Sequence, residues 1–375
     1  MAAFLGTLRT NECYAALFNM ILSQQNFADN IQKHQTLVEQ AKEEAGLFGD
    51  QKLYYSTDAL ASKVWGADLT HPKGGVQDVE AANLLNVERA PAPACQALVI
   101  DCFRIIALTT DEYMSKRAWG TESAFADFTS IMIGWMADTR KVYEGTLYNS
   151  FIGTDESVIG EQQQTVHLES ASASDPLYGL TGVEKEQMEA MIIAQNLADL
   201  FVLMGDYNRD FNDYQFLRSY ADENIKVIWN SKFVNKIRKV DLPTIFHKDG
   251  LVDKFEQEIL PARYFGSVQG TAHTSVAGER SLLETDYTVG GVTTHVFPGD
   301  VIPTGASVAA GASYIVDDTI IAKVVVKLPP MLSAFSASTS FYNPRALITN
   351  RYLIWGHSTL EHLLNYPMIT IRASY

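Results

Sequence analysis

The chain has 375 residues, of which 47% are hydrophobic and 19% are charged. This length allows about two or three packed units with sizeable cores, and the composition argues against a disordered, collagen-like or coiled-coil chain. The 29 basic and 44 acidic residues give a formal net charge of −15. Tight binding to nucleic acid or to an anionic membrane through the bulk surface is therefore disfavoured, because both need a basic face.

Cysteine usage and the N-terminal segment bear on the compartment. Cys13, Cys95 and Cys102 are odd in number and lack CxxC spacing, which argues against a zinc site or a disulfide framework and indicates a reducing compartment. The N-terminal segment has no cationic region ahead of an apolar run, and no stretch reaches ~18 uninterrupted apolar residues. We expect a soluble chain that no signal peptide exports.

The first predicted element is a helix over residues 11–46, where apolar residues recur at spacings of three and four. In its second half the apolar stripe thins to Ile31, Leu37, Val38 and Ala41. A stripe this thin rarely anchors a helix to its own core. Two interpretations stay open, a frayed surface helix or an arm that lies across a neighbouring subunit.

From residue 51 to residue 119 the pattern changes to β, with two apolar runs around a proline-broken connection at 90–93. The second run, 97–108, would span roughly 40 Å as a strand, which is long for a small domain. Its two alternating apolar sets are Leu98, Ile100, Cys102 and Ile106, and Val99, Phe103, Ile105 and Ala107. The neighbouring sequence offers little to bury these sets against, so we expect an extended β arm.

The clearest helix of the chain is predicted from Gly120 towards Gly153, with a Thr cap and an acid in its first turn. One apolar stripe runs along it through Phe125, Phe128, Met132, Trp135 and Val142, and the pattern continues through Tyr143 and Leu147 towards Gly153. This stripe predicts a packing spine in which Trp135 is buried. The same periodicity fits a core helix of an ordinary enzyme.

A polar stretch over residues 155–180 marks a boundary. The sequence of 181–184, Thr-Gly-Val-Glu, matches a capping box and predicts a second helix that ends at Gly205. The remaining predicted elements are a strand at 225–229, a helical piece at 232–238, β-structure over 287–328 and a final strand at 367–375.

Signals for chemistry are weak throughout. Asp206, Asn208 and Asp210 match the opening of a calcium loop, but Phe211 and Leu217 stand where the loop needs Gly and Glu, so a solvated acidic helix end is the better interpretation. The chain has neither a G-x-S-x-G elbow nor a phosphate loop, and its histidines are scattered. We expect no catalytic, cofactor-binding or metal-binding residue, and no cofactor.

Two whole phrases resemble the major capsid proteins of tailed bacteriophages, most nearly those of short-tailed phages, which have a Hong-Kong-97-like fold. They are DTRKVYEGTLYNSFIGT at 138–154 and NIKVIWNSKFVNKIRKVDLPTIFHKDG at 224–250. The order of predicted elements is similar to that family as well. The resemblance implies an α+β fold with a long spine helix and these parts: 1–50 as an N-terminal arm, 51–119 as an extended β loop, 120–180 and 345–375 as a peripheral domain to which the last strand returns, and 181–344 as an axial domain.

The resemblance also implies a function. The chain would be a structural subunit and no enzyme, assembling as hexamers and pentamers into an icosahedral virion head that encloses double-stranded DNA without sequence-specific binding and without a membrane. It would occupy the virion capsid, and the host cytoplasm during assembly. Implied partners are portal and decoration proteins and a separate scaffold, if any, since the chain leaves no room for a scaffolding segment ahead of the arm. Some members crosslink a loop Lys to a peripheral-domain Asn, but no motif supports this role for Lys63, Lys73 or Asn350.

Physical arguments are compatible with a shell subunit. Arms that cannot bury their apolar faces alone need large interfaces with other subunits. An acidic balance suits a container, because a basic lining would trap DNA while it is packed. Two other classes stay open: a cytoplasmic two-domain enzyme with an unrecognised site, and a β-rich protein that binds carbohydrate or a receptor.

Overall fold

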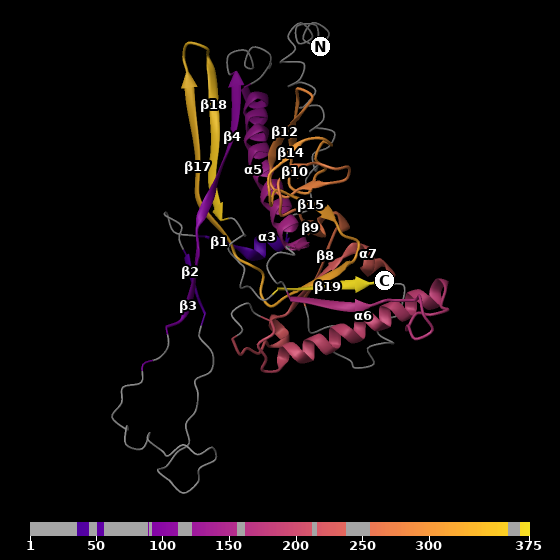
Figure 1. Ribbon diagram of the computed structural model, residues 1–375. Helices are drawn as coiled ribbons and strands as arrows, with labels where there is room; N and C mark the ends of the chain where they lie inside the picture. Colours follow the sequence, from indigo (N-terminus) through magenta and orange to yellow (C-terminus); the bar gives the residue numbers. More distant parts are fainter. Residues whose placement is uncertain are drawn as a thin grey trace.

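The computed structural model shows a mixed α+β fold in which one long helix runs beside a tall sheet and ends against a second sheet (Figure 1). It describes residues 36–44, 51–55, 89, 92–111, 122–155, 162–211, 216–237, 256–358 and 368–375. The predicted long helix is confirmed as α5, Glu122–Gly153, with 32 residues.

The buried side of α5 agrees with the predicted pattern at Tyr143 and Leu147 but differs from it at Trp135. Trp135 is 44% exposed, so its predicted burial is wrong, and the side chains of Phe125, Phe128 and Met132 lie outside the described residues. Among the α5 side chains that the structure describes, those from residue 134 onward, the buried apolar ones are Met136, Tyr143, Leu147, Tyr148 and Ile152. Because apolar residues occupy two adjacent stripes of this helix, a period of 3.6 residues could not tell which one meets the sheets.

The tall sheet has four strands in the order β1 (Lys42–Glu44), β17 (Met331–Asn343), β18 (Ile348–Ser358) and β4 (Ile100–Asp111). The predicted long strand is confirmed as β4, but its interpretation as an arm without a local partner is wrong. β4 pairs antiparallel with β18 from Ile100↔Ser358 to Asp111↔Ile348. A partner this far along the chain leaves no trace in the sequence around β4.

The N-terminal helix is confirmed for α3, Thr36–Ala41, after which the chain turns into β1 instead of continuing as helix to residue 46. Leu37, Val38 and Ala41 are buried against α5 and β17, so this part packs into the chain's own core, contrary to the thin-stripe expectation. Three apolar residues suffice because the larger neighbours supply the rest of the contact. Residues 11–35 lie outside the described residues.

The second sheet has five strands in the order β6 (Gln162–His167), β19 (Met368–Ser374), β16 (Ile320–Val325), β7 (Lys226–Asn230) and β8 (Glu256–Leu260). Helix α6, Gly182–Gly205, covers one face, and the end of α5 lies against the other. Every residue of β16 is buried as a result.

The elements predicted for this region are present. The strand at 225–229 is β7, the helical piece is α7 (Ser231–Ile237) and the final strand is β19. Helix α6 begins after Thr181 as predicted, but the Thr181 side chain makes no cap hydrogen bond, so the capping box is not formed. By length and apolar composition α6 could also cross a membrane, yet its inner face is buried against the sheet like that of a core helix.

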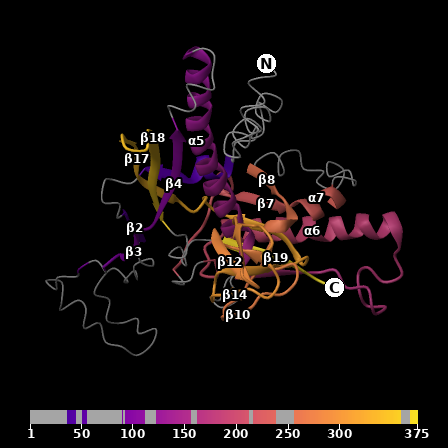
Figure 2. The ribbon, with the colours of Figure 1, turned by 90° about the horizontal axis from the view of Figure 1, so that it is seen from above.

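A small β module, most of whose strands lie between β8 and β16 in the sequence, is on another side of α5 from the tall sheet (Figure 2). Its members are β5 (Thr154–Asp155), β9 (Gly266–Val268), β11 (Arg280–Ser281) and β15 (Ser313–Val316), and the pairs β10 (His273–Thr274) with β14 (Ser307–Val308) and β12 (Thr285–Val289) with β13 (Val292–Val296). The module has its own small core around Tyr287, Val296 and Ile302. Gly290 and Gly291 both have positive φ, as the tight β12–β13 turn requires.

Sheet pairing bears on the expected division into domains. The β17–β18 hairpin spans the expected boundary at 344/345, so its two strands belong to one sheet. The final strand β19 pairs with β16 and β6, and so lies in the five-stranded sheet with β7. The hairpin β2 (Gln51–Tyr55) with β3 (Ala94–Leu98) leads directly into β4 (Figure 1).

Candidate functional site

The tall sheet has one covered face and one open face. Along β4, Phe103 and Ile105 are 64% and 59% exposed, while Arg104 and Ile106, which alternate with them, are half-buried. The two alternating apolar sets read from the sequence thus lie on opposite faces. The set with Phe103 and Ile105 points away from α5.

The covered face is fixed to α5 by polar and aromatic contacts. Arg104 donates from Nε to Oη of Tyr143 at 3.2 Å, and the same Oη lies 2.8 Å from Nε2 of His357 on β18. Burial raises the pKa of Tyr143 above its ordinary value and outweighs the hydrogen bond from Arg104, so the phenol stays protonated. Arg140 lies over the ring of Trp355 at 5.4 Å.

We call the opposite side of β4, β18 and β17 the outer face. Directly paired residues of antiparallel strands share a face, so the register defines it. Its members are Phe103, Ile105, Ala107, Thr109 and Asp111 on β4, Ile348, Asn350, Tyr352 and Ile354 on β18, and Thr339, Phe341 and Asn343 on β17. Asp111, at the end of β4, is the one charged residue among them. The β4 members from Phe103 to Thr109 are exposed, and the β18 members are half-buried. A largely apolar surface of this kind, with charge only at its end, is typical of protein–protein contact.

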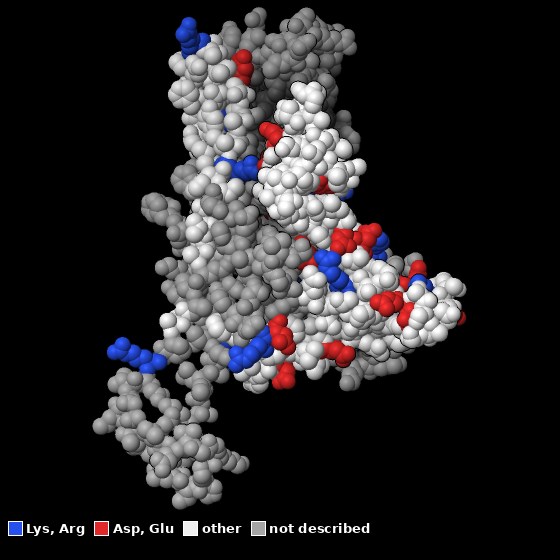
Figure 3. All heavy atoms as spheres, viewed as in Figure 1, with Lys and Arg blue, Asp and Glu red and all other residues white. Residues whose placement is uncertain are grey.

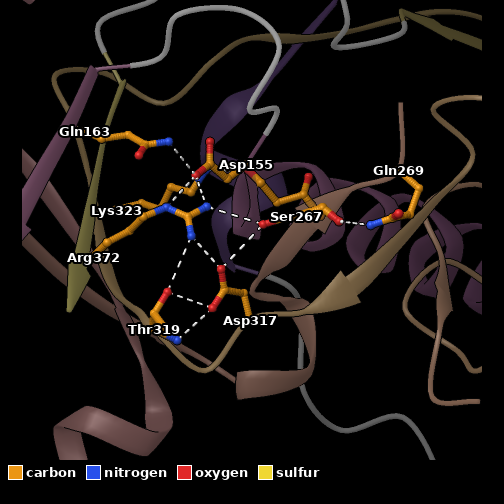
Figure 4. Close-up of polar contacts among 9 residues, drawn as sticks. Asp155, Gln163, Ser267, Gln269, Asp317, Thr319, Lys323 and Arg372 are labelled. Carbon is orange, nitrogen blue, oxygen red and sulfur yellow. Dashed lines mark hydrogen bonds and ion pairs between the residues drawn. The ribbon is translucent and has the colours of Figure 1, made fainter. Parts of the chain in front are cut away.

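A second feature is a polar junction where the end of α5, the five-stranded sheet and the β module meet (Figure 4). Arg372 of β19 donates from Nε to Asp155 Oδ2 at 3.0 Å and from Nη1 to Asp317. Asp317 in turn accepts from the backbone N–H of Thr319 at 2.9 Å. Lys323 of β16, fully buried, donates to the backbone carbonyl of Thr154.

The charges of this junction balance, because Arg372 and Lys323 face Asp155 and Asp317 (Figure 4). Burial alone would raise the pKa of Asp317, but hydrogen bonds from Thr319 and Arg372 outweigh it and lower that pKa. Burial lowers the pKa of Arg372, and its bonds with Asp155 and Asp317 raise it overall. Such an arrangement fixes the relative position of three segments and offers no chemistry of its own.

Close packing beside the junction allows no side chain on Gly153. A Cβ there would lie 2.3 Å from the carbonyl oxygen of Tyr264. Helix α5 therefore ends where the backbone must approach the β module, and Asp155 follows two residues later. The sequence held one signal for the junction, namely a lone cation inside each of two apolar strands, Lys323 and Arg372.

Two histidines of the β module pair with carboxylates. The fully buried Glu279 lies 2.7 Å from Nε2 of His273 and accepts the N–H of Val276 at 2.9 Å. His295 lies between Asp286 at 2.6 Å and Glu284 at 2.8 Å. The hydrogen bond to Asp286, and then that to Glu284, raise the pKa of His295 although partial burial opposes the rise.

The calcium-like segment predicted from the sequence lies at the end of α6. Asn208 donates to the carbonyl of Leu203, and Asp206 accepts the N–H of Tyr207 at 2.8 Å, so the calcium-like segment closes the end of α6. No group of three or more His, Cys, Asp or Glu able to hold a metal ion occurs within the described part of the chain.

The crosslinking candidates are not brought together within the described residues. Asn350 contacts Oγ1 of Thr109 at 2.8 Å, and Lys63 and Lys73 fall outside the described residues. Cys102 is a free, half-buried thiol on the covered face of β4. Cys13 also lies outside the described residues.

Comparison with known proteins gives a fold likeness. No family model and no curated protein matches the chain. It is similar to a solved structure described as "Capsid structure of Staphylococcus phage Andhra", with 12% identity, a TM-score of 0.50, and coverage of 89% of this chain and 83% of that one. It is similar also to a chain in "Structure of head fiber and inner core protein gp22 of native bacteriophage P68", with 9% identity, a TM-score of 0.50, and coverage of 88% and 83%. The mixed α+β fold with several sheets therefore matches a bacteriophage capsid fold.

Proposed function

We propose that this chain is the major capsid protein of a tailed bacteriophage, a structural subunit that self-assembles into an icosahedral head around packaged DNA. The fold likeness to a phage capsid over 89% of the chain supports the class. The observation that carries the proposal within the chain is the outer face, where a protein of net charge −15 exposes Phe103 and Ile105 among uncharged neighbours and carries charge only at Asp111, at the end of β4. Copies of the chain that repel one another overall can touch there without burying unpaired charges.

The Hong-Kong-97-like division into parts belongs to this proposal. α5 with the tall sheet is the peripheral domain, and the five-stranded sheet with α6 and α7 is the axial domain. The β2–β3 hairpin is the base of the extended loop, and the arm precedes α3. Compared with the sequence expectation, β17 joins the peripheral domain and β19 joins the axial one, because their sheet partners lie there.

Partners and location follow from the same proposal. The subunits form hexamers and pentamers, enclose double-stranded DNA without reading its sequence, and meet a portal and any scaffold or decoration proteins. The net negative charge supports enclosure without trapping, since phosphate binding needs a basic lining. The head is part of the virion, and assembly takes place in the host cytoplasm. The subunit has no enzymatic role, and no observation on the described residues favours the enzyme or binding-protein alternatives.

Assembly of purified protein tests the proposal. Negative-stain microscopy and sedimentation should show closed shells or capsomers, with scaffold protein added if one exists. The double variant Phe103→Asp, Ile105→Asp places two charges on the outer face and should stay as small species, because each charge would lose its water at the interface. Val292→Asp is the matched control, since Val292 is 67% exposed at the turn end of β13, away from the outer face.

Folding of each variant is checked by circular dichroism, so that lost assembly is not confused with lost structure. A wild-type chain that remains monomeric under all assembly conditions would contradict the function. If the double variant forms normal shells, the capsid function is still supported, but the outer face is not part of the interface between subunits.

A further inference from the structure

Glu284, directly before β12, has partners in two units of the molecule. Its Oε1 lies 2.8 Å from Nε2 of His295 on β13, within the β module. Its Oε2 lies 3.7 Å from Nη2 of Arg104 on β4, in the tall sheet. Figure 3 shows acidic and basic side chains close together where the β module borders the tall sheet. The carboxylate of Glu284 therefore links the two units.

His295 has an acceptor oxygen on each side of its ring. Nδ1 lies 2.6 Å from Oδ1 of Asp286, which is paired with His295 across β12 and β13, while Nε2 faces Glu284. A neutral imidazole carries one N–H and one lone pair, so only the imidazolium ion can donate to both carboxylates. The ring of Phe297 stands perpendicular to that of His295, with 5.1 Å between the centroids, and brings no charge. This arrangement is that of a protonated His295.

Arg104 is fixed beside Glu284 whichever way the carboxylate turns. Its Nη2 donates to the backbone carbonyl of Glu284 at 3.0 Å, and its Nε donates to Oη of Tyr143 on α5 at 3.2 Å. The same Oη lies 2.8 Å from Nε2 of His357 on β18. The carboxylate of Glu284 thus needs only a side-chain rotation to bond to Arg104, and that bond would join the β module to β4, α5 and β18.

The two distances show which partner holds the carboxylate. At 2.8 Å the contact with His295 is a charge-assisted hydrogen bond, whereas 3.7 Å to Arg104 is an ion pair without a hydrogen bond. If His295 loses its proton, one ring nitrogen presents a lone pair to a carboxylate and that bond is lost. Arg104 keeps its charge over the whole range in which histidine titrates. The neutral ring therefore leaves Arg104 as the better partner of Glu284.

The β module and the tall sheet share no core that would override this change. The apolar cluster of the module, around Tyr287, Val296 and Ile302, has no described residue in common with the cluster of α5 and the tall sheet. Figure 2 shows the two units on different sides of α5. The side chains of Glu284 and Arg104 are only 18% and 29% exposed, so their attraction is partly shielded from water.

We propose that Glu284 is a proton-operated switch between the β module and the tall sheet. With His295 protonated, the carboxylate bonds to His295. With His295 neutral, it turns to Arg104 and holds the β module more firmly against β4, the strand that also carries the outer face. The proposal goes beyond the assembly function and does not depend on it, because the contact lies within one copy.

The proton affinity of His295 tests the switch. Nuclear magnetic resonance of unassembled protein with isotope-labelled histidine rings measures it in a titration from about pH 5 upwards, and His295→Gln identifies the signal. Coupling between two sites is reciprocal, so removing Arg104 must strengthen proton binding at His295 if both compete for one carboxylate. Arg104→Gln should raise the proton-binding constant of His295 about threefold, and Glu284→Gln should lower it by about the same factor.

Two controls separate the switch from a general effect of charge. In the Glu284→Gln background, Arg104→Gln should change the constant by less than about 1.5-fold, because the shared carboxylate is gone. Direct repulsion between the two cations would persist in that background. Arg351→Gln is the matched control: Arg351 lies opposite Leu108 on the same covered face, and its Nε has no hydrogen-bond partner in the described part of the chain. It should leave the titration of His295 unchanged.

The wild-type chain gives a readout that needs no variant to fold. The guanidinium N–H groups of Arg104, observed in protein with isotope-labelled arginine, should exchange with water about threefold more slowly once His295 has lost its proton, because the bond to Glu284 then closes. Arg351 in the same spectrum corrects for the general pH dependence of exchange. Arg104→Lys identifies the signal by its loss.

Each outcome decides the switch separately from the capsid function. An unchanged titration of His295 in Arg104→Gln, an equal change in the Glu284→Gln background, or Arg104 exchange that does not slow as His295 titrates overturns the switch and leaves the capsid function as it was. A wild type that never assembles contradicts the capsid function alone, because the switch is measured in unassembled protein.

Discussion

The two large sheets of this protein are built from similar apolar strands but end in different environments. β16 is buried along its whole length, between α6 on one face and the end of α5 on the other. β4 is covered by α5 on one face and leaves Phe103 and Ile105 exposed on the other. The sequence pattern of both strands indicates two apolar faces. Whether the second face is buried in the chain's own core or stays exposed depends on the elements that pack beside it.

We expect substitutions in the five-stranded sheet, which is covered on both faces, to lower the free energy of unfolding more than substitutions in the tall sheet. The largest loss is expected at the polar junction. Arg372→Met removes the cation that pairs with Asp155 and Asp317. The carboxylate of Asp155, which is fully buried, then loses its ion-pair partner. Breaking one side of a buried ion pair costs about 3–5 kcal/mol of unfolding free energy. Urea unfolding of unassembled protein measures it. Arg345→Ala, in the exposed turn between β17 and β18, is the control and should change stability by no more than about 0.5 kcal/mol. Equal effects of the two substitutions would show that the junction does not stabilise the sheet.

Helix α3 in the N-terminal segment is a further case, because its thin apolar stripe did not predict burial in the chain's own core. Leu37 is 3% exposed and packs in the cluster that α5 shares with β17 and β18. Leu37→Ala should therefore cost about 2–5 kcal/mol, the range for a buried leucine. Glu39→Gln, on the exposed side of the same helix, is the control. If Leu37→Ala leaves the urea unfolding midpoint unchanged, α3 does not contribute to the core and belongs to an arm. Removal of residues 1–45 should then leave the rest of the chain folded.

Adjacent residues of α5 separate its buried side from its open side. Met136 is 7% exposed and Trp135 is 44% exposed. Met136→Ala should destabilise unassembled protein by about 2–5 kcal/mol, and Trp135→Ala by about 1 kcal/mol or less. Thermal unfolding of both variants decides between the stripes. If Trp135→Ala lowers stability more than Met136→Ala does, the stripe predicted from the sequence is the buried one.

The smallest expected effect is a pH dependence in the β module. Because its carboxylate partners raise the pKa of His295 above the ordinary 6.5, the protonated ring stabilises the folded state. This contribution is fully present below the unfolded pKa of 6.5 and is lost as the pH rises through the higher folded value. His295→Gln should flatten this part of the stability profile, while His167→Gln, at a mostly exposed position, serves as control. The ring is half-exposed, so solvent screening keeps the effect small.

The individual helices and strands could be predicted from the sequence. α5, α6, β7 and β19 follow from periodicity, caps and alternation, which are properties of neighbouring residues. The two phrases at 138–154 and 224–250 indicated the capsid class, and the fold likeness agrees with it.

Tertiary structure alone decided which elements meet. The pairing of β4 with β18, the packing of α3 on α5 and the bonds of Arg372 with Asp155 and Asp317 all join residues far apart in the chain. Sequence patterning specifies a face and its polarity, but the free energy of burial depends on what covers that face. For that reason the sequence by itself determined the strands and helices of this protein, and the three-dimensional arrangement determined which apolar face became core and which stayed exposed.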